Sequence, residues 1–178
     1  MENLKVTAEH VTTWELVYRL ALSTEGKDVR PDNVSCDWVR KILRAEHSPI
    51  RGKMYLVRIE NCPTYVWTHF VRHKIGVEWF IQSQRDDRSN NPIPRAEMPQ
   101  GSPNNGTFLV NAQALINISR KRLCLKASKE TREVWYAVNR AIARIDPVMS
   151  CFMLPECSYR GSCPEMKPCN KAGDGKDC

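Results

Sequence analysis

The segment Lys53–Glu60 (KMYLVRIE) constrains the fold most, because its side chains alternate between two sets. Tyr55, Val57 and Ile59 form one set, and Asn61-Cys62-Pro63 ends the alternation. A period of two is typical of a half-buried β-strand, whereas an amphipathic helix repeats every 3.6 residues or so. We therefore predict a strand here, and a fold that contains a sheet.

Helical periodicity flanks this strand on both sides. We predict helices over residues 9–23, 33–47, 64–74, 108–126 and 128–145, and a second strand over residues 78–85. Asn33 and Ser128 are the candidate N-caps of the second and the last of these helices. Residues 86–106 are rich in Asn, Pro, Ser and Gly and predict a long loop. The mixture predicts an α/β (α+β) fold, a central sheet flanked by helices.

The chain of 178 residues carries 27 Lys and Arg against 20 Asp and Glu, a formal charge of +7. This excess favours an anionic partner, which could be nucleic acid, a membrane surface or a phosphorylated ligand. With 42% hydrophobic residues the chain can build one core, so we assign residues 1–150 to a single domain and 151–178 to a Cys-, Pro- and Gly-rich tail. No apolar run reaches the length of a bilayer span and no secretory signal is visible, so we expect a cytoplasmic protein.

The chain contains eight cysteines, five of them in its last 28 residues. In a reducing compartment we expect free thiols or metal ligands rather than disulfides. Cys157, Cys163 and Cys169 follow one another at equal intervals, which suggests a zinc site. The intervals differ from the tight C-x2-C pair, so we predict reduced thiols and no metal. We expect residues 170–178 to be disordered.

Two short basic segments are the main candidates for chemistry. Arg72-His73-Lys74 ends a predicted helix on which His69, Arg72 and His73 share one face, and Ser83-Gln84-Arg85 ends a predicted strand. Guanidinium groups bind phosphate oxygens in pairs and hydroxyl groups add further hydrogen bonds. A phosphate-binding surface is one interpretation, and a solvated basic face is the other.

The two basic segments resemble the signature of the flavin-dependent thymidylate synthases (ThyX), which reads R-H-R, seven variable positions, then S-x-R-Y. Upstream, Glu46-His47-Ser48-Pro49 resembles the H-x-T/S-P segment of the family. Downstream, Asn111–Leu115 with Asn117 and Arg122 falls on the spacing of its N-A-R-S-L helix. Lys126–Arg132 resembles the helix opening H/R-A-Q-W-E-I-R that follows. Agreement of four segments in the same order is improbable by chance.

The resemblance implies an α/β homotetramer with active sites between subunits. It implies FAD as cofactor, dUMP as substrate, and NADPH and methylene-tetrahydrofolate as co-substrates. The implied reaction transfers a one-carbon unit to C5 of dUMP and completes the methyl group with hydride from the flavin. One alternative is a paralogue that hydroxymethylates dUMP or methylates another uridine nucleotide. Another is a non-catalytic protein that binds flavin, nucleotide or nucleic acid, although we expect neither nucleic acid nor a membrane as partner.

The resemblance also assigns residues. Arg122 matches the arginine at the uracil carbonyl, where a guanidinium stabilises the enolate-like charge that forms as C5 becomes nucleophilic. Arg120 would project about 160° away from Arg122 on the same helix, so we expect it on the surface. The substrate-binding residues implied are His69, Arg72, Ser83, Gln84, Arg85 and Arg122. Among them, Ser83 and Arg85 would hold the phosphate of the nucleotide. The cofactor-binding residues implied are Ser48, Arg72, His73, Lys74, Gln113, Asn117 and Lys126.

One departure from the family pattern concerns the predicted loop. Only 25 residues separate Arg85 from Asn111, where typical members have several helices that contribute another dUMP-binding arginine. Arg88 and Arg95 are the candidates to replace that arginine.

Overall fold

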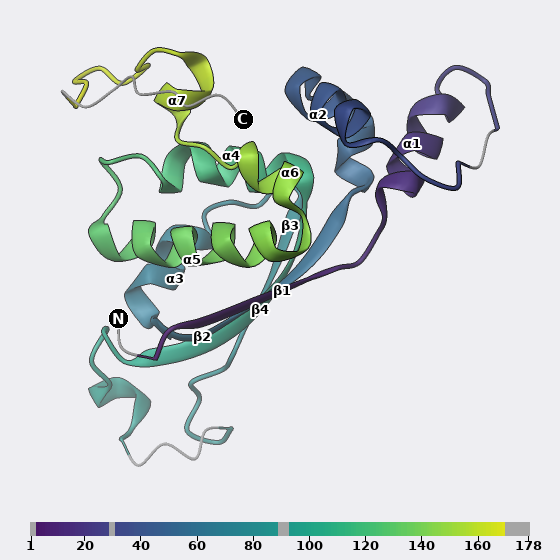
Figure 1. The fold of residues 1–178 in the computed structure, drawn as a ribbon. Coiled ribbons are helices and arrows are strands. Elements are labelled where there is room, and N and C mark those ends of the chain that lie inside the picture. Colours follow the sequence, from purple (N-terminus) through teal and green to yellow (C-terminus); the bar gives the residue numbers. More distant parts are fainter. Residues whose placement is uncertain (1–2, 29–30, 89–92, 170–178) are drawn as a thin grey trace.

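The computed structural model describes residues 3–28, 31–88 and 93–169 (Figure 1). The predicted disorder of residues 170–178 falls outside this part of the chain. Within it, the strands form one antiparallel sheet in the order β1-β2-β4-β3. These strands are β1 (Lys5–His10), β2 (Met54–Pro63), β3 (Val77–Ile81) and β4 (Pro103–Asn111).

One face of the sheet supplies the core, because alternate residues of each strand point to it. Tyr55, Val57 and Ile59 of β2 are completely buried, so the strand predicted from the alternation is confirmed. In β4, which pairs with β2, Phe108 lies opposite Val57 and Val110 lies opposite Tyr55. The two central strands therefore bury their apolar residues side by side.

Three helices cover this face (Figure 1): α3 (Thr64–Phe70), α4 (Ala112–Arg122) and α5 (Lys129–Ile145). The remaining helical elements are α1 (Trp14–Ser23), α2 (Cys36–Ala45), η1 (Ser48–Gly52), η2 (Arg95–Glu97), α6 (Pro147–Cys151) and α7 (Glu156–Arg160). In the described residues, none of these helices combines the length and the apolar character that crossing a bilayer requires.

Aromatic side chains join the sheet to the helices above it. The ring centroids of Phe70 in α3 and Trp79 in β3 are 6.1 Å apart, and those of Phe108 in β4 and Trp135 in α5 are also 6.1 Å apart. The indole Nε1 of Trp135 donates to the buried Ser119 hydroxyl at 2.8 Å, so the ring brings no unpaired polar atom into the core. These contacts fix α3, α4 and β3 relative to one another.

The N-terminal predictions are correct in kind and wrong in their limits. The helix predicted over residues 9–23 begins only at Trp14, because residues 5–10 pair with β2 as a strand that the sequence pattern did not predict. The second predicted helix begins at Cys36, and its cap is the Ser35 hydroxyl rather than Asn33. The helix predicted over residues 128–145 is confirmed, including its cap.

The helix predicted over residues 108–126 is wrong at both ends. Its first residues complete β4, and Asn111 then ends the strand and caps α4 by accepting from the Ala114 amide at 2.8 Å. The helix ends at Arg122, not at residue 126. Because β4 starts at Pro103, the predicted loop over residues 86–106 is also shorter than expected.

The segment that carries the basic signature differs from its prediction too. The helix predicted over residues 64–74 ends at Phe70, and the strand predicted over residues 78–85 ends at Ile81. Arg72 and His73 therefore lie in the turn that follows α3, and the prediction of one helical face shared with His69 is wrong.

Candidate active site

The turn between α3 and β3 positions the first group of predicted site residues. Gly76, with φ of 74°, closes this turn, and a Cβ there would lie 2.6 Å from the Asn111 side-chain nitrogen. The Gly76 carbonyl accepts from the Asn111 amide at 2.9 Å, which ties the turn to the start of α4. The indole of Trp79 donates to the His73 carbonyl at 2.8 Å. The backbone of His73 is thus held by the sheet although it lies outside any helix or strand.

Arg122, at the end of α4, meets this turn. Its Nε donates to His73 Nε2 at 2.9 Å, and its Nη2 donates to the His69 carbonyl at 2.7 Å. Its remaining terminal nitrogen, Nη1, forms no hydrogen bond with the described residues. We call His69, Arg72, His73 and Arg122 the Arg122 cluster. The structure therefore brings together four predicted site residues and leaves one donor of Arg122 available to a ligand.

Burial and neighbouring positive charges lower the pKa values of three residues in the Arg122 cluster. Burial, reinforced by Arg122, lowers the pKa of His73 to about 4. Burial and the nearby Arg72 lower the pKa of Arg122, and burial together with both arginines lowers the pKa of His69. His73 is consequently neutral near pH 7 and accepts from Arg122 through Nε2. The concentration of positive charge suits a site for an anionic or carbonyl oxygen.

This shift predicts a pH dependence of stability. The pKa of His73 is about 4 in the folded chain, against about 6.5 for an unperturbed histidine, so the unfolded chain binds more protons between these values. We expect the free energy of unfolding to fall as the pH drops from about 6.5 to about 4. Urea unfolding across this range, compared with His73→Gln, measures the effect. An equal slope in both proteins would contradict it, because glutamine still accepts from Arg122 but does not titrate.

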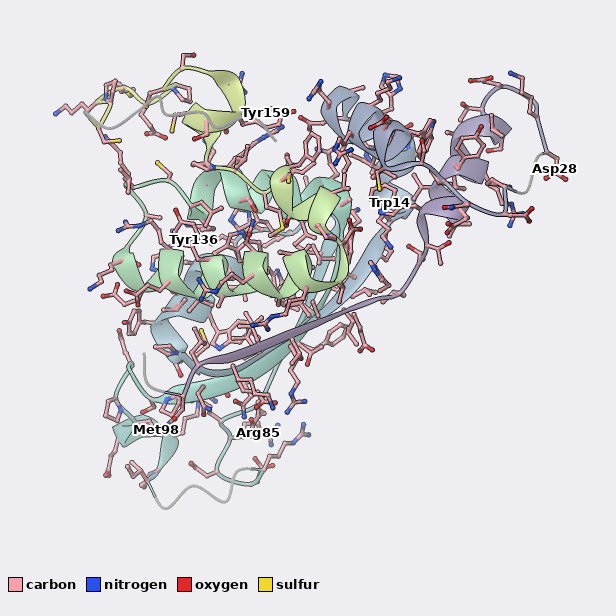
Figure 2. All side chains as sticks on the ribbon, in the orientation of Figure 1. Trp14, Asp28, Arg85, Met98, Tyr136 and Tyr159 are labelled. Carbon is pink, nitrogen blue, oxygen red and sulfur yellow. The ribbon has the colours of Figure 1, made fainter. Side chains whose placement is uncertain are left out.

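The second predicted group lies beyond the other end of β3. Ser83 and Arg85 are exposed, the Ser83 hydroxyl accepts from the Arg85 amide at 3.3 Å, and the Arg85 guanidinium binds both oxygens of Asp87 at 2.7 and 2.8 Å. Gln84 donates to the Thr64 hydroxyl at 3.1 Å instead of facing a ligand. Figure 2 shows Arg85 on the segment that leaves the sheet, away from the helices.

The five residues of β3 separate the Arg122 cluster from Ser83 and Arg85. A strand of that length spans about 16 Å. Within the described residues, no hydrogen bond joins Ser83 or Arg85 to the cluster.

A third group surrounds Glu46, which ends α2 in a left-handed conformation with φ of 49°. Its carboxylate accepts from Gln113, Arg120 and the Tyr159 hydroxyl, and the Arg120 guanidinium stacks 3.8 Å from the centre of the Tyr159 ring. Asn117 accepts from Gln113 at 3.4 Å and from Arg120 at 3.1 Å. We call these five residues the Glu46 network. Figure 2 shows its Tyr159 on the side of the molecule opposite to Arg85.

One feature of the Glu46 network differs from the prediction. Arg120 is not a surface residue, because its side chain is only 14% exposed and its Nε is buried without a hydrogen-bond partner in the described part of the chain. Burial alone would raise the pKa of Glu46, but hydrogen bonds from Tyr159, Gln113 and Arg120 outweigh it, so the pKa is lowered. The spacing of residues 113, 117 and 120 on one helix face could have revealed the group on α4.

The predicted flavin-binding residues therefore lie on several separate parts of one copy of the chain. Asn117 and Arg122 are five residues apart on α4, which separates their directions by about 140°. Ser48 opens η1 and is exposed, and Lys74 is exposed in the turn of the Arg122 cluster. Lys126 lies beyond α4, on a different cavity. The sequence does not reveal this separation, because motif order says nothing about which face a residue occupies.

The cavity next to Lys126 has a volume of about 210 Å³ and is lined by four thiols. They belong to Cys124, Cys157, Cys163 and Cys169. Cys36, Cys62, Cys124, Cys157, Cys163 and Cys169 form no disulfide with one another in the described part of the chain. Among the described residues, no three histidine, cysteine or carboxylate side chains are arranged to hold a metal ion.

Solved structures similar to this chain share one fold. ThyX from Helicobacter pylori, with FAD and dUMP, has a TM-score of 0.64 at 16% identity, covering 78% of this chain and 92% of its own. A second H. pylori ThyX structure, also with FAD and dUMP, has a TM-score of 0.68 at 14% identity, covering 84% and 99%. The UMP/dUMP methylase PolB from Streptomyces cacaoi, bound to 5-Br dUMP, has a TM-score of 0.63 at 16% identity, covering 82% and 93%.

No protein-family model matches the sequence, and no curated protein matches it. The structural similarity extends over most of the chain and over nearly all of each solved structure, so the ThyX-like fold predicted from the resemblance is confirmed.

Proposed function

We propose that the protein is a flavin-dependent, ThyX-like enzyme that transfers a one-carbon unit from methylene-tetrahydrofolate to C5 of dUMP. The observation that carries this proposal is Arg122, whose guanidinium is held at two nitrogens by His73 and the His69 carbonyl. We propose that Nη1, which forms no hydrogen bond with a described residue, donates to the uracil carbonyl. Negative charge grows on that carbonyl oxygen as C5 attacks, and a guanidinium fixed beforehand stabilises this charge without reorganising.

The residues present fit FAD. Arg72 and Lys74 are exposed and form no ion pair with a described carboxylate, so both charges are available to a pyrophosphate. Asn117 and Ser48 offer exposed polar groups, and His73 presents a neutral imidazole in the Arg122 cluster. The chemistry that the flavin supplies when bound is hydride donation to the one-carbon unit. We propose NADPH as the reductant for the bound flavin and the cytoplasm as the compartment.

The separation of the groups supports active sites shared between copies of the chain. We propose that a nucleotide whose base meets Arg122 of one copy places its phosphate on Ser83 and Arg85 of another, because β3 lies between the two groups within one copy. We propose the homotetramer that the resemblance implies. Sedimentation of the flavin-loaded protein is expected to give an oligomer, and removal of flavin is expected to shift it toward smaller species. A flavin-loaded monomer would contradict the shared site.

Arg85 provides the test of the phosphate assignment. Arg85→Ala is expected to weaken dUMP binding by about 1.5–3 kcal/mol, the range for hydrogen bonds to a charged group, and to leave deoxyuridine binding nearly unchanged. Titration calorimetry with both ligands measures the difference. Arg51→Ala, at an exposed arginine of η1, is the matched control. Equal weakening of both ligands by Arg85→Ala would remove the phosphate from this residue.

The fold shared with PolB, a UMP/dUMP methylase, favours one second candidate: methylation of UMP as well as dUMP. Release of tritium from C5-labelled dUMP and UMP, with FAD, NADPH and methylene-tetrahydrofolate present, decides between the substrates. Release from dUMP supports the main proposal, and faster release from UMP supports the second. Bound yellow flavin without release from either nucleotide would leave a binding protein and overturn both.

A further inference from the structure

A cavity of about 360 Å³ lies where the end of β1 meets α1, α2 and α6. Figure 2 shows one of its wall residues, Trp14, at the start of α1 near this junction. The wall is largely apolar, and no predicted site residue of the proposed enzyme lines it. Its apolar lining comes from Trp14, Val34, Val39, Ile145, Pro147 and Val148, and its polar lining from His10, Thr13, Glu15, Cys36, Lys53 and Asp146.

Lys53 is the unusual member of this wall, because a lysine is almost never buried without a carboxylate partner. The residue is 1% exposed. Its Nζ donates to the Thr12 carbonyl and to His10 Nδ1, the latter at 3.0 Å. The same nitrogen lies 5.6 Å from the Trp14 ring centre and 4.9 Å from that of Tyr55.

The hydrogen bonds of His10 settle the direction of the Lys53 contact. His10 Nε2 lies 3.1 Å from the Ile145 carbonyl, which can only accept, so Nε2 carries the proton and Nδ1 is the acceptor. A neutral amine at Lys53 thus donates its two N–H groups to the Thr12 carbonyl and to His10 Nδ1. Its lone pair then remains free, directed away from both acceptors.

The carboxylates near Lys53 do not return its pKa to the ordinary value of a lysine. Burial lowers the pKa of Lys53 to about 8, against opposing contributions from Asp146 and Glu15. Asp146 does not bind the amine, because its oxygens accept from Tyr55, Trp14 and the Met149 amide. A large neutral fraction in an apolar cavity is the condition that activates a lysine as a nucleophile.

We propose that Lys53 and this cavity form a second site, separate from the proposed ThyX-like site, which captures a small apolar aldehyde or ketone as a Schiff base. The amine lone pair attacks the carbonyl carbon, and the oxygen takes a proton to give a carbinolamine. Loss of the hydroxyl group as water, with loss of the last nitrogen proton, forms the C=N bond. His10 Nδ1 is placed to receive protons that leave the nitrogen, and no oxidation or reduction occurs.

Reductive trapping tests this site without reference to enzyme activity. The full-length protein is treated with butyraldehyde and sodium cyanoborohydride at pH 8, and butylated lysines are located by peptide mass spectrometry. About half of the Lys53 side chains are neutral at this pH, against below about 1% for a lysine with the ordinary pKa of about 10.4. We expect Lys53 to be labelled at least about tenfold faster than the exposed Lys41 of α2.

A cavity-filling variant separates binding from mere reactivity. Val34→Phe places a larger side chain in the cavity wall and is expected to lower Lys53 labelling at least about fivefold, while Lys41 labelling is unchanged. Val11→Phe, at a residue that is 52% exposed and outside the cavity, is the matched control and should leave Lys53 labelling unchanged. Labelling of Lys53 no faster than Lys41, labelling only after unfolding in urea, or equal labelling in both variants would overturn the proposal.

Discussion

Arg122→Ala is expected to lower the single-turnover rate of one-carbon transfer to dUMP about 100- to 1,000-fold while changing dUMP affinity much less. The charge that Arg122 meets on the uracil carbonyl is small in the bound ground state and grows as C5 attacks. An interaction that strengthens only in the transition state appears in the rate and not in the binding constant. Rapid-quench measurement of the rate and calorimetric measurement of dUMP affinity distinguish the two.

The control for this experiment follows from the structure. Arg120 is unsuitable, because its guanidinium is bound within the Glu46 network and its loss would disturb α4. Arg140 is exposed on α5 and forms no ion pair with a described residue, so Arg140→Ala is expected to leave both rate and affinity within about twofold of the unmodified protein. Equal rates for Arg122→Ala and Arg140→Ala would exclude Arg122 from the mechanism.

The elements that the sequence predicts well are those with one strong periodic signal. In β2 buried residues alternate with more exposed ones along the strand. In α5 a serine caps the helix and apolar residues form one buried stripe. In both elements the local sequence pattern agrees with the burial in the fold. β1 and β4 lack such agreement. Lys5–His10 has only Val6 fully buried, and β4 begins in the polar run Pro103–Gly106, where its pairing with β2 rather than its composition makes a strand.

The sequence motifs predict which residues belong to the candidate site, but not which of them contact one another. The resemblance names His73 and Arg122, but the hydrogen bond between them joins residues 49 positions apart and depends on the turn that Gly76 closes. The link between Glu46 and Tyr159 spans 113 positions and involves the segment that we assigned to a Cys-, Pro- and Gly-rich tail. Motif spacing likewise does not reveal that α4 turns Asn117 and Arg122 to different faces.

The largest expected effect on stability is at Asp146, a carboxylate that is 5% exposed and joins three elements. Its Oδ2 accepts from the Tyr55 hydroxyl at 2.7 Å and from Trp14 Nε1 at 2.8 Å, and its Oδ1 accepts from the Met149 amide at 3.0 Å. Burial, followed by the influence of Asp146, raises the pKa of Tyr55, so its hydroxyl stays protonated and donates. The Asp146 carboxylate thus links β2, α1 and α6 through hydrogen bonds.

Asp146→Ala is expected to lower the free energy of unfolding by about 3–5 kcal/mol, the range for removing one partner of a buried charge network. The Tyr55 hydroxyl would remain buried without an acceptor, and Lys53 would lose a nearby negative charge. Tyr55→Phe and Trp14→Phe each remove one donor to the carboxylate and are expected to cost about 1.5–3 kcal/mol, which keeps the test measurable if Asp146→Ala does not fold. Asp37→Ala, at an exposed ion pair with Arg40, is expected to cost below about 1 kcal/mol. Urea unfolding measures all four, and a loss at Asp146 no larger than that at Asp37 would show that the carboxylate does not hold these elements together.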